Sequence, residues 1–115
     1  MLLVLAVQEA GLRSTLAAQL AMAGASLITA KDVDDPAVTR GVRRPAVLVL
    51  DAETVTGKSE AWLADTLEDP RWHQVVALTP NPPAPHPKLM HCAPGNAVSV
   101  LTEKLPQWGE DSGVA

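Results

Sequence analysis

The stretch Ala46-Val47-Leu48-Val49-Leu50, closed by Asp51, decides the fold of this chain. Five consecutive apolar residues without a polar interruption predict a strand buried on both faces, as in parallel sheets. Pro45 precedes the strand, where a missing amide hydrogen does little harm. Asp51 then stands at the carboxyl end of the strand, which is the edge of an open α/β sheet where ligands bind.

Apolar runs and helical spacing predict the remaining elements. Further strands are expected at residues 2–7, 27–30, 74–79 and 88–92, and helices at residues 12–23, from residue 36 to between 41 and 44, 59–69 and 96–105. Residues 52–58 are predicted to be a loop. Strands that alternate with helices predict a five-stranded parallel sheet with helices on both faces.

The composition restricts the class of protein. The chain has 115 residues, enough for one domain, and 47% of them are apolar. The net charge of −4 argues against nucleic-acid binding, since lysines and arginines that would neutralise phosphates are scarce. A single cysteine excludes an internal disulfide and fits a reducing compartment. Residues 1–7 are too short to span a bilayer and lack a basic leader, so we predict a cytoplasmic domain without membrane contact.

Four segments together resemble the receiver domain, the phosphoacceptor module of bacterial two-component response regulators. These segments are residues 2–20, 24–30, 47–51 and 76–79, and the resemblance extends over residues 2–107. It implies a flavodoxin-like α/β fold and a role in signal transduction, such as transcription regulation through an output domain. It also implies that Asp51 is the phosphoacceptor equivalent, that Thr79 is the phosphate-sensing equivalent, and that Pro94 follows the fifth strand.

The chain departs from the receiver pattern at the positions that carry the chemistry. The acidic pair that holds Mg²⁺ in receivers falls on Gln8-Glu9 or, with a shift of one residue, on Val7-Gln8, so at most one carboxylate remains. The lysine before the proline is replaced by Ala93, and the Met-Pro after the phosphoacceptor by Thr54-Val55.

These losses predict a non-catalytic pseudo-receiver without a cofactor or a bound metal. Phosphoryl transfer depends on positioning and on neutralisation of charge, most of which a divalent ion supplies. A phosphoryl group on Asp51 would also lack its lysine partner. We therefore interpret Asp51 as a retained carboxylate that accepts hydrogen bonds at a helix end or in a loop. The domain is expected to act through a protein partner or a fused output domain, and not as an enzyme.

Two alternatives stay open at the level of sequence. One is a working receiver that binds Mg²⁺ and accepts a phosphoryl group on Asp51 from a histidine kinase. The other is a pseudo-receiver that senses a small ligand such as a nucleotide, although no cluster of arginines or aromatic residues marks the loops.

A proline-rich segment, residues 80–87, takes the place of the fourth helix of receivers, since no helix tolerates this density of proline. It is interpreted either as a rigid docking loop for a partner or as a stiff connector. The candidate docking residues are Pro82, Pro83, Pro85, His86 and Pro87.

Other motifs are given structural interpretations. Residues 52–59 come close to a phosphate-binding P-loop but lack its first glycine, and we favour a surface loop in which Ser59 caps a helix. Cys92 beside His91 is interpreted as a small buried hydrophobe rather than a nucleophile. The three histidines lack the spacing of metal ligands. Residues 1–107 are predicted to form the domain, and residues 108–115 a tail or linker.

Overall fold

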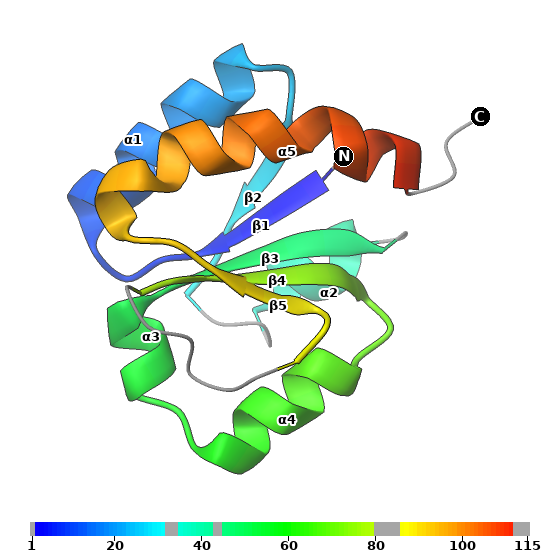
Figure 1. Cartoon of the computed structure of the whole chain (residues 1–115). Coiled ribbons are helices and arrows are strands. Elements are labelled where there is room, and N and C mark those ends of the chain that lie inside the picture. Colours follow the sequence, from blue (N-terminus) through cyan, green and yellow to red (C-terminus); the bar gives the residue numbers. More distant parts are fainter. Residues whose placement is uncertain (1, 32–34, 43–44, 80–85, 112–115) are drawn as a thin grey trace.

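The computed structural model describes residues 2–31, 35–42, 45–79 and 86–111 (Figure 1). Its elements are β1 (Leu2–Ala6), α1 (Ala10–Met22), β2 (Ser26–Thr29), α2 (Pro36–Gly41), β3 (Ala46–Asp51), α3 (Ala52–Thr56), α4 (Glu60–Glu68), β4 (Trp72–Leu78), β5 (Leu89–His91) and α5 (Ala97–Asp111). A 3₁₀ turn, Pro94–Asn96, precedes α5. The predicted alternation of strands and helices is confirmed.

The five strands form one parallel sheet in the order β2-β1-β3-β4-β5. β3 lies at its centre, where Leu48 pairs with Val4 of β1 on one side and with Val75 of β4 on the other. This is the α/β layout of a flavodoxin-like fold. β2 lies on one side of β1 and β3 lies on the other, so the strand order reverses direction between β1 and β3. In open α/β sheets ligands bind at this point, beyond the carboxyl ends of the two strands.

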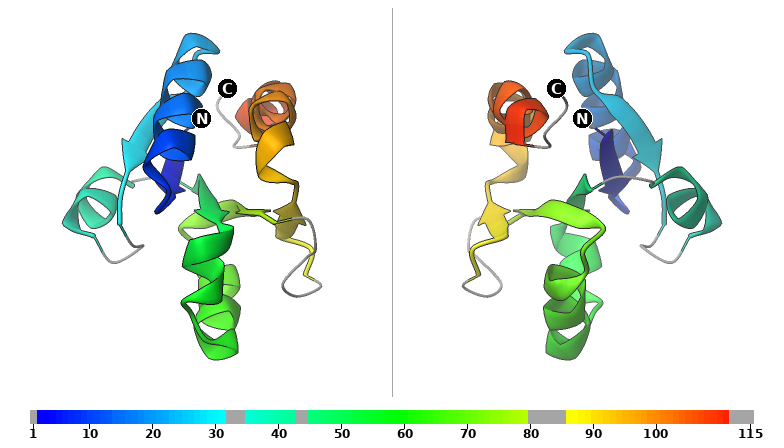
Figure 2. Two further views of the ribbon diagram at one scale, coloured as in Figure 1. Left: turned by 90° about the vertical axis from the view of Figure 1, so that its left-hand side faces the viewer. Right: turned by 90° about the vertical axis from the view of Figure 1, so that its right-hand side faces the viewer.

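Helices cover both faces of the sheet, and each face has its own apolar core. Leu3 and Val49 point to the face covered by α1 and α5, whose Leu16 and Leu101 are fully buried there. Figure 2 shows α1 and α5 together on this side, with α3 and α4 on the opposite side. Each buried Leu or Val stabilises the fold by about 1.5–3 kcal/mol, so the alternating strand residues fix which face each helix covers.

The second face is covered by the helices that follow β2 and β3. Val38 of α2 and Leu63 of α4 pack there against Leu48 and Leu50 of β3. Every residue of β3 is buried, which confirms the prediction of a strand enclosed on both sides.

Gly24 ends α1 as its position in the sequence predicts. Its φ of 96° lies in the left-handed region, and its amide donates to the carbonyl of Ala21 while the amide of Ala25 donates to that of Leu20. These two hydrogen bonds form a Schellman motif, which only glycine adopts without steric cost.

Two predictions about the chain's irregular segments are wrong. Residues 52–58 are not a loop, because Ala52–Thr56 form α3 directly after β3. Residues 108–111 do not begin a tail, because they continue α5 and the side chain of Trp108 is only 2% exposed in the first core. Residues 112–115 lie outside the described part of the chain.

The segment between β4 and β5 contains no helix among its described residues, which are Thr79 and residues 86–88. The predicted docking residues Pro82, Pro83 and Pro85 lie outside the described ranges, whereas His86 and Pro87 lie within them. Across all the ranges the structure describes, none of the helices has the length and apolar character needed to cross a bilayer.

Candidate functional site

Asp51 joins three elements at the carboxyl edge of the sheet. It is the last residue of β3 and also the N-cap of α3, with φ and ψ of −83° and 170°. Only 3% of its surface is exposed. Aspartate is rarely buried to this extent, because removing a charged carboxylate from water costs free energy. Hydrogen-bond partners must offset that cost.

Both oxygens of the Asp51 carboxylate are occupied. Oδ2 accepts hydrogen bonds from the amides of Gln8 at 2.9 Å and Glu9 at 3.0 Å, which follow β1. Oδ1 accepts from the amide of Thr54 at 2.9 Å and contacts the Thr54 hydroxyl. This hydroxyl also lies 3.0 Å from the carbonyl of Ala6, so its single proton is shared. Since each carboxylate oxygen has two lone pairs, the four contacts use the full capacity of the side chain.

These contacts hold Asp51 in its charged form. Burial by itself raises the pKa of Asp51, but the hydrogen bonds from the Thr54 side chain and from the amides of Glu9, Thr54 and Gln8 together lower the pKa below its ordinary value of 3.8. The carboxylate is therefore an ionised acceptor that ties the loop after β1 to the start of α3.

Thr54→Val tests this arrangement through the pH dependence of stability. The stability that ionised Asp51 contributes is present above pH 3.8, its ordinary pKa, and is lost as the pH falls through the lowered value. Without the Thr54 hydroxyl the pKa moves back towards 3.8, so we expect a loss of about 1–2 kcal/mol at neutral pH and a shallower decline in acid. Urea unfolding followed between about pH 2 and pH 7 measures both.

Thr56→Val is the matched control for that experiment, because Thr56 is exposed on the same short helix. It should leave both the stability and its pH dependence unchanged. Equal effects of the two substitutions would mean that the Thr54 hydroxyl does not support the Asp51 carboxylate.

Gln8 and Glu9, the degenerate acidic positions, direct their side chains away from Asp51. The Glu9 carboxylate accepts from the amides of Gly11 and Leu12 and so caps α1, which begins at Ala10. The Gln8 amide group donates to the carbonyl of Lys31 at 2.7 Å. Their backbone amides, and not their side chains, reach Asp51.

The other positions implied by the resemblance to receivers lie around the same edge. Thr79 directly follows β4 and is half-buried. Ala93 and Pro94 follow β5, and Ala93 is the extended residue before the 3₁₀ turn. Ala93 offers no charged group towards Asp51, and Pro94 lines the pocket beside it.

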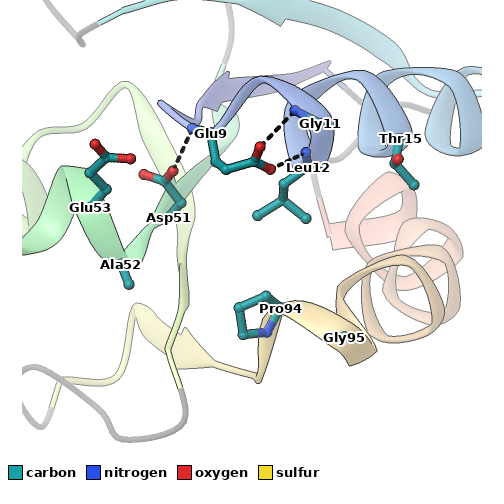
Figure 3. A pocket seen from close by; sticks show the side chains of 9 residues that line it. All are labelled: Glu9, Gly11, Leu12, Thr15, Asp51, Ala52, Glu53, Pro94 and Gly95. Carbon is teal, nitrogen blue, oxygen red and sulfur yellow. Dashed lines mark hydrogen bonds between the residues drawn. The ribbon is translucent and has the colours of Figure 1, made fainter.

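A pocket of about 580 Å³ lies between the start of α1, the start of α3 and the turn before α5. Figure 3 shows Leu12 and Pro94 turned towards each other across the pocket, with Asp51 and Glu53 to their left. Glu9, Asp51 and Glu53 supply three carboxylates, and none of the nine lining residues, all within the described ranges, is a lysine, arginine or histidine. The described side chains that line the pocket therefore include no cation that would pair with a phosphate.

His86 fastens the end of the proline-rich segment to α4 and β4. Its Nδ1 accepts from the amide of Lys88 at 3.0 Å, and its Nε2 lies 3.3 Å from the Glu68 carboxylate. The ammonium group of Lys88 donates to the carbonyl of Asp69 at 3.0 Å. Pro87 is exposed. This end of the predicted docking segment is thus remote in sequence and in contacts from Asp51.

The remaining motifs have structural roles. Ser59 accepts from the amide of Trp62 at 3.1 Å and caps α4, as predicted, although the residues before it form α3. Cys92 is half-buried, and burial raises the pKa of its thiol, which keeps it protonated. Within the described ranges, no three His, Cys, Asp or Glu side chains are grouped so as to hold a metal ion.

Thr54 is the functional neighbour that sequence reasoning missed. It was noted only as a departure from the receiver pattern, whereas it is 5% exposed and supplies two of the four contacts to Asp51. The available signal was the spacing Asp-x-x-Thr after a buried strand, which places the threonine amide within reach of an N-cap aspartate.

Comparison with known proteins adds no assignment: a scan against protein-family models and searches of the curated proteins and the solved structures find no match.

Proposed function

We propose that this chain is a pseudo-receiver, a signalling module that does not transfer phosphoryl groups and acts through contact with a protein partner or an output domain. The proposal combines the resemblance in sequence with the parallel α/β layout and the state of Asp51. The single observation that carries it is that Asp51 serves as a buried helix cap whose carboxylate is fully hydrogen-bonded.

The occupancy of the carboxylate argues against phosphorylation. A nucleophilic oxygen must present a lone pair in line with the leaving group of the phosphoryl donor. Each Asp51 oxygen would first have to give up a hydrogen bond to a charged acceptor, at a cost of about 1.5–3 kcal/mol. The amides of Gln8 and Glu9, which are part-buried at this contact, would then lose their acceptor, and the Thr54 hydroxyl would keep only the Ala6 carbonyl.

The surrounding charges argue in the same direction. Mg²⁺ bound by one or two carboxylates relies on substrate phosphate and water for its remaining ligands. Glu9, the one acidic residue at the degenerate pair, already caps α1 with its carboxylate. A phosphoryl group on Asp51 would meet Glu9 and Glu53 without a lysine or arginine among the lining residues of the pocket. Like charges that line the same pocket repel one another and so disfavour the phosphorylated state.

A phosphodonor experiment tests the proposal. The protein is incubated with acetyl phosphate and millimolar Mg²⁺, and its intact mass is compared with that of an established receiver domain in the same reaction. We expect the mass of this chain to stay unchanged while the receiver gains one phosphoryl group. In parallel, beryllofluoride with Mg²⁺ should leave the amide resonances of Gln8, Glu9 and Thr54 unshifted.

A gain of one phosphoryl group that disappears in Asp51→Asn would overturn the proposal in favour of a working receiver. A gain that persists in Asp51→Asn would place the modification elsewhere and leave Asp51 unreactive, as proposed.

A further inference from the structure

The pocket beside Asp51 combines apolar walls with carboxylates, and its described lining residues include no cationic side chain. Leu12 of α1 and Pro94 of the 3₁₀ turn form two facing apolar walls, and Ala52 of α3 lies to their left, beneath Asp51 (Figure 3). Gly95 contributes no side chain, and apart from its neighbours along the chain no described atom lies within 4 Å of the position a Cβ would take there, whereas at Gly11 that position is 3.2 Å from the Glu9 carboxylate. At about 580 Å³ the pocket has room for a long side chain together with an apolar neighbour.

The charge of the pocket selects the kind of ligand. Its carboxylates come from Glu9, Asp51 and Glu53, and Glu9 and Glu53 are exposed residues. Hydrogen bonds from backbone amides satisfy Glu9 and Asp51 but do not cancel their charge. Arg13, the nearest cation along α1, donates to the carbonyl of Val7. An anionic ligand would therefore be repelled, and a cation with an apolar stem is complementary to both properties of the pocket.

We propose that this pocket binds a lysine or arginine side chain of a partner protein, with its stem against Leu12 and Pro94 and its cation facing the exposed carboxylate of Glu53. The inference rests on the proposed function and adds to it the chemistry of the partner. It commits to a protein segment in which the basic residue is flanked by an apolar one, because the pocket is larger than one side chain and its walls are apolar.

A defined peptide provides the test. The full chain labelled with nitrogen-15 is titrated at low salt with an acetylated and amidated peptide, Gly-Leu-Lys-Leu-Gly, and with the same peptide carrying norleucine for lysine. We expect saturable shifts of the amides of Gly11, Leu12 and Gly95 with the lysine peptide. The norleucine peptide keeps the stem and loses the charge, so its affinity should be about fivefold lower, as for an exposed ion pair.

Two variants separate the pocket from the overall acidity of the chain. Glu53→Gln should lower the affinity for the lysine peptide by about fivefold and leave the affinity for the norleucine peptide unchanged. Glu103→Gln removes the same charge from an exposed site on α5 and should change neither affinity. A dispersed amide spectrum for each variant confirms that it folds.

Three outcomes would overturn the inference: equal affinity for both peptides, equal effects of the two variants, or no saturable shift at these amides at millimolar peptide. The phosphodonor experiment is read separately. Phosphorylation of Asp51 with intact peptide binding would refute only the proposed function, and an unreactive Asp51 without peptide binding would refute only the inference.

Discussion

We expect Asp51→Ala to lower the free energy of unfolding by about 3–5 kcal/mol at neutral pH. The substitution removes both oxygens that accept from the amides of Gln8 and Glu9, together with the N-cap of α3. These part-buried donors then lose the acceptor that Asp51, itself only 3% exposed, supplies to them. Urea unfolding monitored by far-ultraviolet circular dichroism measures the loss.

Asp65→Ala is the matched control, because Asp65 is exposed on α4 and should change stability by less than about 0.5 kcal/mol. Asp51→Asn keeps one acceptor oxygen and should lie between wild type and Asp51→Ala. A neutral or stabilising effect of Asp51→Ala would contradict the structural role, since that is the response expected of a carboxylate held in place for function at a cost in stability.

We expect Trp108→Ala to lower the free energy of unfolding by about 3–5 kcal/mol, the range for large aromatic residues removed from a core. The Trp108 side chain is 2% exposed and belongs to the core between the sheet and the pair α1 and α5. Its loss leaves a cavity in this core, which includes Leu20 and Leu101 and is packed too closely to collapse fully into the space. Thermal and urea unfolding of the full chain measure the effect.

Gln107→Ala serves as the comparison, because the neighbouring side chain is exposed on the same helix. It should leave stability within about 0.5 kcal/mol of wild type. If Trp108→Ala were equally mild, residues from 108 onward would behave as the tail that the sequence predicts, and the core would end at Leu105.

The sheet was predictable because buried parallel strands leave a strong signal. The runs at residues 46–50 and 75–78 contain no polar residue, and the structure buries β3 completely. The errors fall on short or terminal elements. α3 has only five residues, too few to show helical periodicity. The extension of α5 through Pro106 was missed because proline and glycine near the end of a pattern normally indicate a stop.

The candidate site was only partly predictable for a related reason. Asp51 could be placed at the functional edge because the strand that precedes it is unmistakable. What it contacts could not be predicted, since the amides of Gln8 and Glu9 come from a loop more than forty residues earlier and carry no side-chain signature. Glu9 matches an acidic position of receivers by sequence, yet its carboxylate follows the local rule for helix capping instead.

The outer strands of the sheet have a consequence for the behaviour of the protein at high concentration. β2 has four residues and β5 has three, and they form the two edges of the sheet. Such short edges offer few backbone groups on which another chain's strand can assemble, which is a recognised protection against aggregation through sheet extension. The strongly apolar β3 would be the strand most prone to pair with strands of other chains if it were exposed. It pairs with β1 on one edge and with β4 on the other, so its backbone groups are not available for such pairing.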